Sequence, residues 1–146
     1  MSDKLYMCVD FDGTICTHEY PEIGTPIPYA LETLKELNDL GHKIILLTMR
    51  GHKPYIQKAT NESGEIVEIK RDTLQEAVDY ITSNGVVLYA VNENPTQKYW
   101  TSSQKVYGNI FVDDAAYGAP LIYPENGRPY LNWLKLRKMF GLDLHN

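Results

Sequence analysis

The sequence predicts an α/β fold, a three-layer sandwich with a central parallel sheet. Short apolar runs, typical of strands buried on both faces, alternate with segments in which apolar residues recur at helical spacing. This alternation predicts parallel strands joined by right-handed crossovers that cover the sheet with helices. The 146 residues are few enough for one domain, and no repeat or linker divides them. We therefore expect residues 1–146 to form a single domain.

Four apolar runs are predicted to form the sheet. Residues 5–9 (LYMCV) and 43–48 (KIILLT) are nearly continuous apolar stretches, as expected of buried strands. Residues 86–91 (VVLYAV) and 109–112 (NIFV) have the same character. The last run leads directly into two aspartates, so its end carries polar side chains.

Three segments are predicted to be helices. In residues 28–40 the apolar side chains fall on one helical face, and Gly41 suits the position after the last turn. Residues 72–83 and 129–140 show the same amphipathic spacing. Residues 51–71 are instead expected to form a hairpin around their Asn-Glu-Ser-Gly segment.

Composition and charge narrow the classes of function. The net charge of -5 and the pI of about 5.3 argue against stable binding to nucleic acid or to an anionic membrane. No apolar segment approaches the ~20 residues that span a bilayer, and the N-terminus has no signal-peptide layout. Cys8 and Cys16 lack metal-ligand spacing and are expected to be free thiols in a reducing compartment. A cytoplasmic protein is therefore expected.

Chemically capable side chains follow three of the four predicted strands. Asp10 and Asp12 follow the first, Thr48 ends the second, and Asp113 and Asp114 follow the fourth. The carboxyl ends of parallel strands meet at one edge of the sheet, which is where ligands bind in open α/β folds. We expect these residues, distant in sequence, to converge there.

Such a cluster suits a hard cation and phosphoryl chemistry. Crowded carboxylates repel one another unless a cation neutralises them, and oxygen ligands together with a phosphate suit Mg²⁺. Asp10 could then attack phosphorus, and Asp12 could protonate the leaving oxygen and later deprotonate water. Gly13 would let the backbone turn and expose N–H groups to the phosphate, while Thr48 would offer a hydroxyl donor.

The residues 10–14 (DFDGT) resemble the first motif of phosphatases of the haloacid dehalogenase (HAD) superfamily. Thr48, Lys105 and the pair Asp113-Asp114 resemble the second, third and fourth motifs of that family, in the same order. The resemblance covers essentially the whole chain and implies a Rossmann-like HAD core. Residues 15–27 leave room only for a small flap, so the chain resembles a minimal member without a large cap domain.

The resemblance implies a role for each matching residue. Asp10 would be the nucleophile and a magnesium ligand, and Asp12 the general acid/base that also gives the metal its backbone carbonyl. Thr48 and Lys105 would hold the phosphoryl group, with Lys98 as the alternative lysine. The assigned metal ligands are Asp10, Asp12, Asp113 and Asp114. Gly13 and Thr14 are assigned as substrate-binding residues, with Thr14 also expected to fix the loop, and Arg50 is added to them because it follows Thr48 by two residues.

Two features leave alternatives open around the substrate. Arg50 could clamp a second anionic group of the substrate, or it could form an ion pair with a local acid. The hairpin expected at 51–71 could overhang the pocket as a lid, lie at the periphery, or contact a second copy in a homodimer.

The sequence thus predicts a Mg²⁺-dependent phosphatase that hydrolyses a phosphate monoester through an aspartyl-phosphate. A small nucleotide or sugar phosphate is the expected substrate. Phosphate on a protein or at a nucleic-acid end is one alternative, because a site without a cap is open. A non-catalytic, metal-binding regulatory module is the other.

Overall fold

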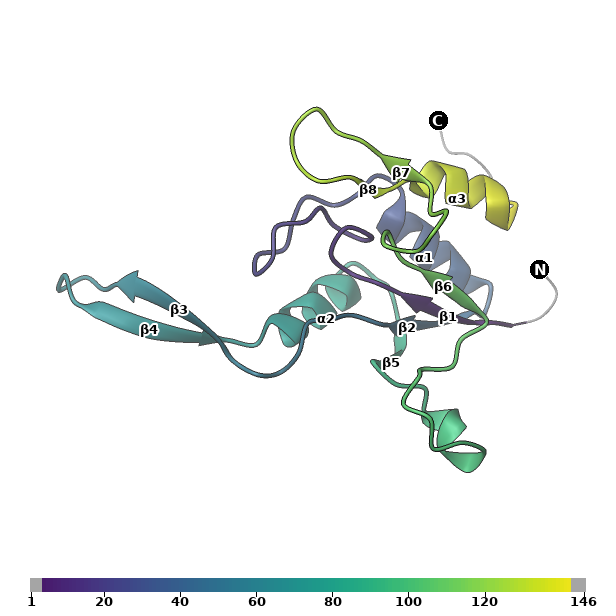
Figure 1. Cartoon of the computed structure of the whole chain (residues 1–146), viewed down its shortest axis with the longest axis horizontal. Coiled ribbons are helices and arrows are strands. Elements are labelled where there is room, and N and C mark those ends of the chain that lie inside the picture. Colours follow the sequence, from purple (N-terminus) through teal and green to yellow (C-terminus); the bar gives the residue numbers. More distant parts are fainter. Residues whose placement is uncertain (1–3, 143–146) are drawn as a thin grey trace.

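A four-stranded parallel sheet forms the centre of the molecule (Figure 1). The computed structural model describes residues 4–142. The strand order is β5-β2-β1-β6, with all neighbours parallel. The strands are β1 (Tyr6–Val9), β2 (Lys43–Leu46), β5 (Leu88–Val91) and β6 (Ile110–Val112). The predicted α/β class with a central parallel sheet is confirmed.

Three helices pack against one buried cluster on this sheet. They are α1 (Ala30–Asp39), α2 (Thr73–Ser83) and α3 (Trp133–Phe140). Their apolar faces join alternate residues of the two central strands, Met7 and Val9 of β1 and Ile44 and Leu46 of β2. Because side chains alternate across a strand, these four residues define one face of the sheet.

The opposite face is covered by residues 92–109, which contain the short 3₁₀ helix η1 (Pro95–Tyr99), not an α-helix. Cys8 of β1 points to this face, where its Sγ lies 3.8 Å from the carbonyl oxygen of Tyr107. Gly108 packs so closely that an added Cβ would lie 2.6 Å from that Sγ. The third layer of the predicted sandwich is therefore a loop, which Asn94 fastens by donating to the Tyr107 carbonyl.

The predicted hairpin forms, with β3 (Tyr55–Thr60) antiparallel to β4 (Ile66–Arg71). Figure 1 shows it projecting well beyond the rest of the molecule. Most of its side chains are exposed, Ile66 among them. Near its base, Tyr55 packs edge-on against Tyr20, whose ring centroid is 5.9 Å away.

The last predicted helix begins later than its apolar spacing indicates. Residues of the expected first turn form β8 (Tyr130–Leu131), which pairs antiparallel with β7 (Leu121–Ile122). Asn132 then caps α3, its side chain accepting a hydrogen bond from the Lys135 N–H. An N-cap with extended backbone ends the strand and begins the helix at the same residue.

Among the residues that the structure describes, no helix is both long and apolar enough to cross a membrane.

Candidate functional site

The carboxyl ends of β1, β2 and β6 bring the predicted acids to one edge of the sheet. Val9, the last residue of β1, pairs with Leu46 of β2 and with Val112 of β6. The Asp10 N–H donates to the Val112 carbonyl at 2.9 Å, so the first aspartate is fixed to the strand that carries the others. This register places Asp10 beside Asp113 although 103 positions separate them.

Asp10, Asp113 and Asp114 form a cluster of half-buried carboxylates. One oxygen from each lies within 4.8 Å of the others. Burial, the charge of Asp113 and a smaller contribution from Asp114 together raise the pKa of Asp10 to about 8, against the opposing effect of the backbone N–H of Phe11. Three carboxyl groups at this spacing cannot all be ionised without a large electrostatic cost unless a positive charge lies near them.

The donor set suits a hard divalent cation. Between residues 4 and 142, no lysine or arginine forms an ion pair with Asp10, Asp113 or Asp114, and the one ion-pair partner that a histidine supplies is His18 at Asp114. All three offer oxygen, the ligand that Mg²⁺ prefers. The carbonyl of Asp12 accepts no backbone hydrogen bond within the described residues and remains available as a further oxygen.

Thr14 lies beneath the acidic cluster. Its side chain is fully buried, and its hydroxyl lies 3.2 Å from Asp10 Oδ2 and 3.3 Å from Asp114 Oδ1. Its predicted contact with substrate stays a prediction. Thr14 holds Asp10 and Asp114 in their relative positions, and Trp133 fixes it by donating from Nε1 to its carbonyl at 2.6 Å.

Gly13 provides the sharp turn that the sequence predicts, with a φ of +83°. Its N–H, however, donates to the Cys16 carbonyl at 2.7 Å, and the Thr14 N–H donates to the Phe11 carbonyl. These two N–H groups therefore fasten the loop, and the expectation that the turn at Gly13 exposes other N–H groups to a phosphate stays a prediction.

Arg50 is bound entirely by the protein. Its Nε and Nη2 donate to the two carboxylate oxygens of Asp12 at 2.9 and 2.8 Å. The remaining N–H groups donate to the carbonyls of Pro21, Glu22 and Thr73. A guanidinium has five N–H donors, and all five are used. The structure thus gives every Arg50 donor a protein partner, and the prediction that Arg50 clamps a substrate anion stays a prediction.

Arg50 connects the acid/base candidate Asp12 to the flap. The guanidinium lies between the rings of Phe11 and Tyr20, 4.9 and 5.1 Å from their centroids. The flap tip is held a second time by Arg71, which bonds Glu22 and the Pro21 carbonyl. The acid that pairs with Arg50 lies 38 positions away and is not the local acid that the sequence suggests.

Thr48 and the two candidate lysines are placed differently. The Thr48 oxygen accepts a hydrogen bond from the Arg50 N–H, which leaves its own hydrogen free to donate, as its predicted role requires. The Lys105 Nζ lies 5.9 Å from the ring centroid of Phe111, and the Lys98 Nζ lies over Tyr99. Neither lysine forms an ion pair with the acidic cluster, so the choice between them stays a prediction.

His18 lies beside the acidic cluster, although it is not among the site residues that the sequence predicts. Its Nε2 lies 2.9 Å from Asp114 Oδ2, and only 14% of its side chain is exposed. The one available signal was its position in the short flap that follows the first motif. No local pattern identifies its partner, which is 96 positions away.

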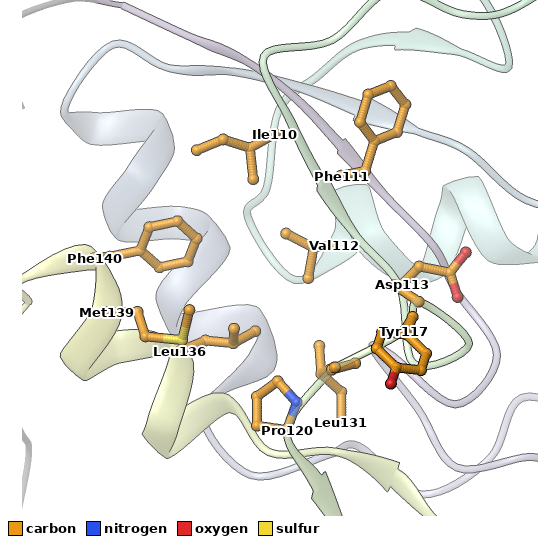
Figure 2. A pocket seen from close by; sticks show the side chains of 13 residues that line it. Ile110, Phe111, Val112, Asp113, Tyr117, Pro120, Leu131, Leu136, Met139 and Phe140 are labelled. Atoms are coloured by element: carbon orange, nitrogen blue, oxygen red, sulfur yellow. The ribbon is translucent and has the colours of Figure 1, made fainter.

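A separate apolar cavity of about 420 Å³ lies between β6, α3 and residues 113–120. Figure 2 shows apolar side chains of β6 and α3 facing one another across it, with Asp113 at its edge and its carboxylate pointing away from them. Neither Asp10 nor Asp114 lines this cavity. The acidic cluster and the cavity are therefore two different features of the molecule.

Comparison with known proteins supports the fold. No protein-family model matches the chain, and no curated protein matches it. The structure is similar to that of a conserved protein from Bacteroides thetaiotaomicron, with a TM-score of 0.68 and 29% sequence identity. The match covers 95% of this chain and 91% of that chain. The shared architecture is thus a parallel-sheet α/β fold over nearly the full length of both proteins.

Proposed function

We propose that this chain is a Mg²⁺-dependent phosphohydrolase of the HAD type that hydrolyses a phosphate monoester through Asp10. The observation that carries the proposal is the convergence of Asp10, Asp113 and Asp114, whose oxygens lie within 4.8 Å of one another at the carboxyl edge of the sheet. These carboxylates and the carbonyl of Asp12 would hold the cation. When bound, Mg²⁺ offsets the crowded negative charge and neutralises part of the charge of the substrate phosphate.

Asp10 is the nucleophile in this proposal. One of its carboxylate oxygens forms a bond to phosphorus while the bond from phosphorus to the leaving oxygen breaks. The Thr14 hydroxyl has one hydrogen, which lies between Asp10 Oδ2 at 3.2 Å and Asp114 Oδ1 at 3.3 Å, and it limits the directions from which Asp10 can attack. Thr48 donates its free hydroxyl hydrogen to the phosphoryl group.

Asp12 transfers the protons. It gives a proton to the leaving alkoxide and later takes one from the water that attacks the aspartyl-phosphate, releasing inorganic phosphate. Because both of its oxygens are bound to Arg50, Asp12 must first exchange one of these hydrogen bonds for a contact with substrate. Arg50 keeps the carboxylate within reach and stabilises it when it is ionised.

The test is hydrolysis of 4-nitrophenyl phosphate with and without Mg²⁺, beside a panel of nucleotides and sugar phosphates. Asp10→Asn should reduce turnover by at least about 10³-fold, because an amide cannot replace the carboxylate nucleophile. Asp79→Asn, at an exposed acid on α2, is the matched control and should keep the wild-type rate. More than about a tenth of the activity in Asp10→Asn would exclude Asp10 as nucleophile.

A second candidate function, a metal-binding module without catalysis, is favoured by the Asp12–Arg50 pair. That pair occupies both oxygens of the acid that a phosphatase needs for proton transfer. Calorimetric titration with Mg²⁺, together with the hydrolysis panel, separates the two functions. A wild-type chain that binds Mg²⁺ and hydrolyses nothing in the panel would support the module, and metal-dependent turnover would exclude it.

A further inference from the structure

His18 connects the flap to the far side of the acidic cluster. The flap, residues 15–27, is closed on itself by the Thr17 N–H to Thr25 carbonyl bond and by the Ile27 N–H to Ile15 carbonyl bond. From it, His18 reaches Asp114, the second residue after β6, at 2.9 Å. The side chains of this pair are only 14% and 13% exposed, so the bond is largely shielded from water.

The close approach of His18 is built into the backbone. A Cβ added to Gly13 would lie 2.0 Å from His18 Nε2 and 2.4 Å from Asp114 Oδ2. No side chain fits at those distances, so the pair can form only above a glycine. Gly13 therefore has two functions here, the left-handed turn and the space for the imidazole.

Asp114 is held at both of its oxygens. The Thr14 hydroxyl lies 3.3 Å from Oδ1, and the same hydroxyl accepts from the Asp114 N–H at 3.2 Å. His18 holds Oδ2. A carboxylate oxygen that is ionised only accepts hydrogen bonds, and in the tautomer with its hydrogen on Nε2 the imidazole of His18 is the donor of this bond. Without His18, the Oδ2 side of Asp114 would lose its partner from the flap.

We propose that His18 is a positioning residue that holds Asp114 in the acidic cluster and fastens the flap over Gly13. Its effect on the cation site rests on the proposed function, whereas its effect on the flap does not. The flap tip has its own attachments, from Arg50 and Arg71 to the Pro21 carbonyl and Glu22. His18 adds the link between the flap and the loop after β6.

The flap arm of the test uses the two native cysteines. Cys16 lies in the flap two residues before His18, and Cys8 lies in β1; both are buried. The rate at which N-ethylmaleimide labels Cys16 reports opening of the flap, and labelling of Cys8 reports opening of the core. His18→Ala should accelerate Cys16 labelling about tenfold or more, as expected for loss of a hydrogen bond to a charged group, and leave Cys8 unchanged.

The cation arm uses calorimetric titration with Mg²⁺ and needs no turnover. His18→Ala should weaken Mg²⁺ binding about 10–100-fold, the usual effect of removing a group that orients a metal ligand. His18→Gln should restore both readouts, because its amide nitrogen can donate from nearly the position of the imidazole Nε2. His52→Ala is the matched control, since His52 also bonds an aspartate, Asp72, but is 65% exposed and lies on the surface.

Each outcome decides the proposal. Unchanged Cys16 labelling in His18→Ala would overturn the flap role, and an unchanged Mg²⁺ affinity would overturn the role at Asp114. Failure of His18→Gln to restore either readout would also overturn it, because the hydrogen bond would then not be the cause. If the wild-type chain binds no Mg²⁺, the proposed function fails, while the cysteine arm still tests the flap.

Discussion

Two turns of this chain share a backbone conformation and differ in everything around them. Gly13, beside the acidic cluster, has a φ of +83°, and Gly64, at the tip of the β3–β4 hairpin, has a φ of +81°. An added Cβ at Gly13 would collide with His18 and Asp114, whereas at Gly64 it would meet nothing within 4 Å. The first turn is fixed by tertiary structure and the second by its own sequence.

The same contrast extends from the turns to their regions. The side chain of Asn61 organises the hairpin turn by accepting from the N–H groups of Ser63 and Glu65. Every partner in that turn is a near neighbour in sequence. Around the acidic cluster, by comparison, hydrogen bonds join residues 38, 96 and 100 positions apart. We expect the flap and cluster to be sensitive to substitution and the hairpin to be tolerant.

The largest expected loss of stability is at Arg50. Arg50→Met would leave the Asp12 carboxylate without its charged partner and remove one donor from each of three backbone carbonyls in a buried site, so the free energy of unfolding should fall by about 3–5 kcal/mol. Urea denaturation measures this loss. Lys58→Met, at a hairpin lysine paired across the strands with Glu68, should change it by less than about 0.5 kcal/mol. Equal losses in the two variants would remove the contrast between the regions.

The glycine pair gives the sharpest comparison. Gly13→Ala and Gly64→Ala carry the same backbone penalty of about 1–2 kcal/mol, since both residues have a left-handed conformation. Gly13→Ala must also displace His18 from Asp114, which adds about 1.5–3 kcal/mol. The difference between the two losses, measured by thermal or urea unfolding, therefore isolates the packing around Gly13. A difference near zero would mean that His18 contributes nothing there.

Shortening the hairpin is expected to change the free energy of unfolding less than the substitutions at Arg50 and Gly13. Replacing residues 57–69 with Asn-Gly keeps the two strand pairs nearest the core, Tyr55 with Arg71 and Ile56 with Lys70. A projecting two-stranded hairpin adds little stability, so the free energy of unfolding should change by less than about 1 kcal/mol. Mg²⁺ affinity should also stay the same. A loss above about 2 kcal/mol would show that the hairpin supports the core.

The sequence by itself determined the elements that depend on local pattern. Apolar runs identified the four strands of the sheet, because strands buried on both faces must be continuously apolar. Turn chemistry identified the β3–β4 hairpin. The order of the strand ends also predicted that Asp10 and Asp113 would meet, because parallel strands align their carboxyl ends. The predicted start of α3 was wrong, because residues of its expected first turn pair with β7 as strand β8.

Only the tertiary structure decided which polar groups bind one another. The sequence allowed Arg50 to bind a substrate anion, but in the fold its N–H groups bind Asp12 and three backbone carbonyls. His18 is not among the site residues that the sequence predicts, and only the folded flap carries it over Gly13 to Asp114. A hydrogen bond depends on positions to within a few tenths of an ångström, and the sequence spacing of distant residues does not contain that information. The sequence pattern thus predicted which edge of the sheet carries the acids, and only the folded structure shows which groups bind them.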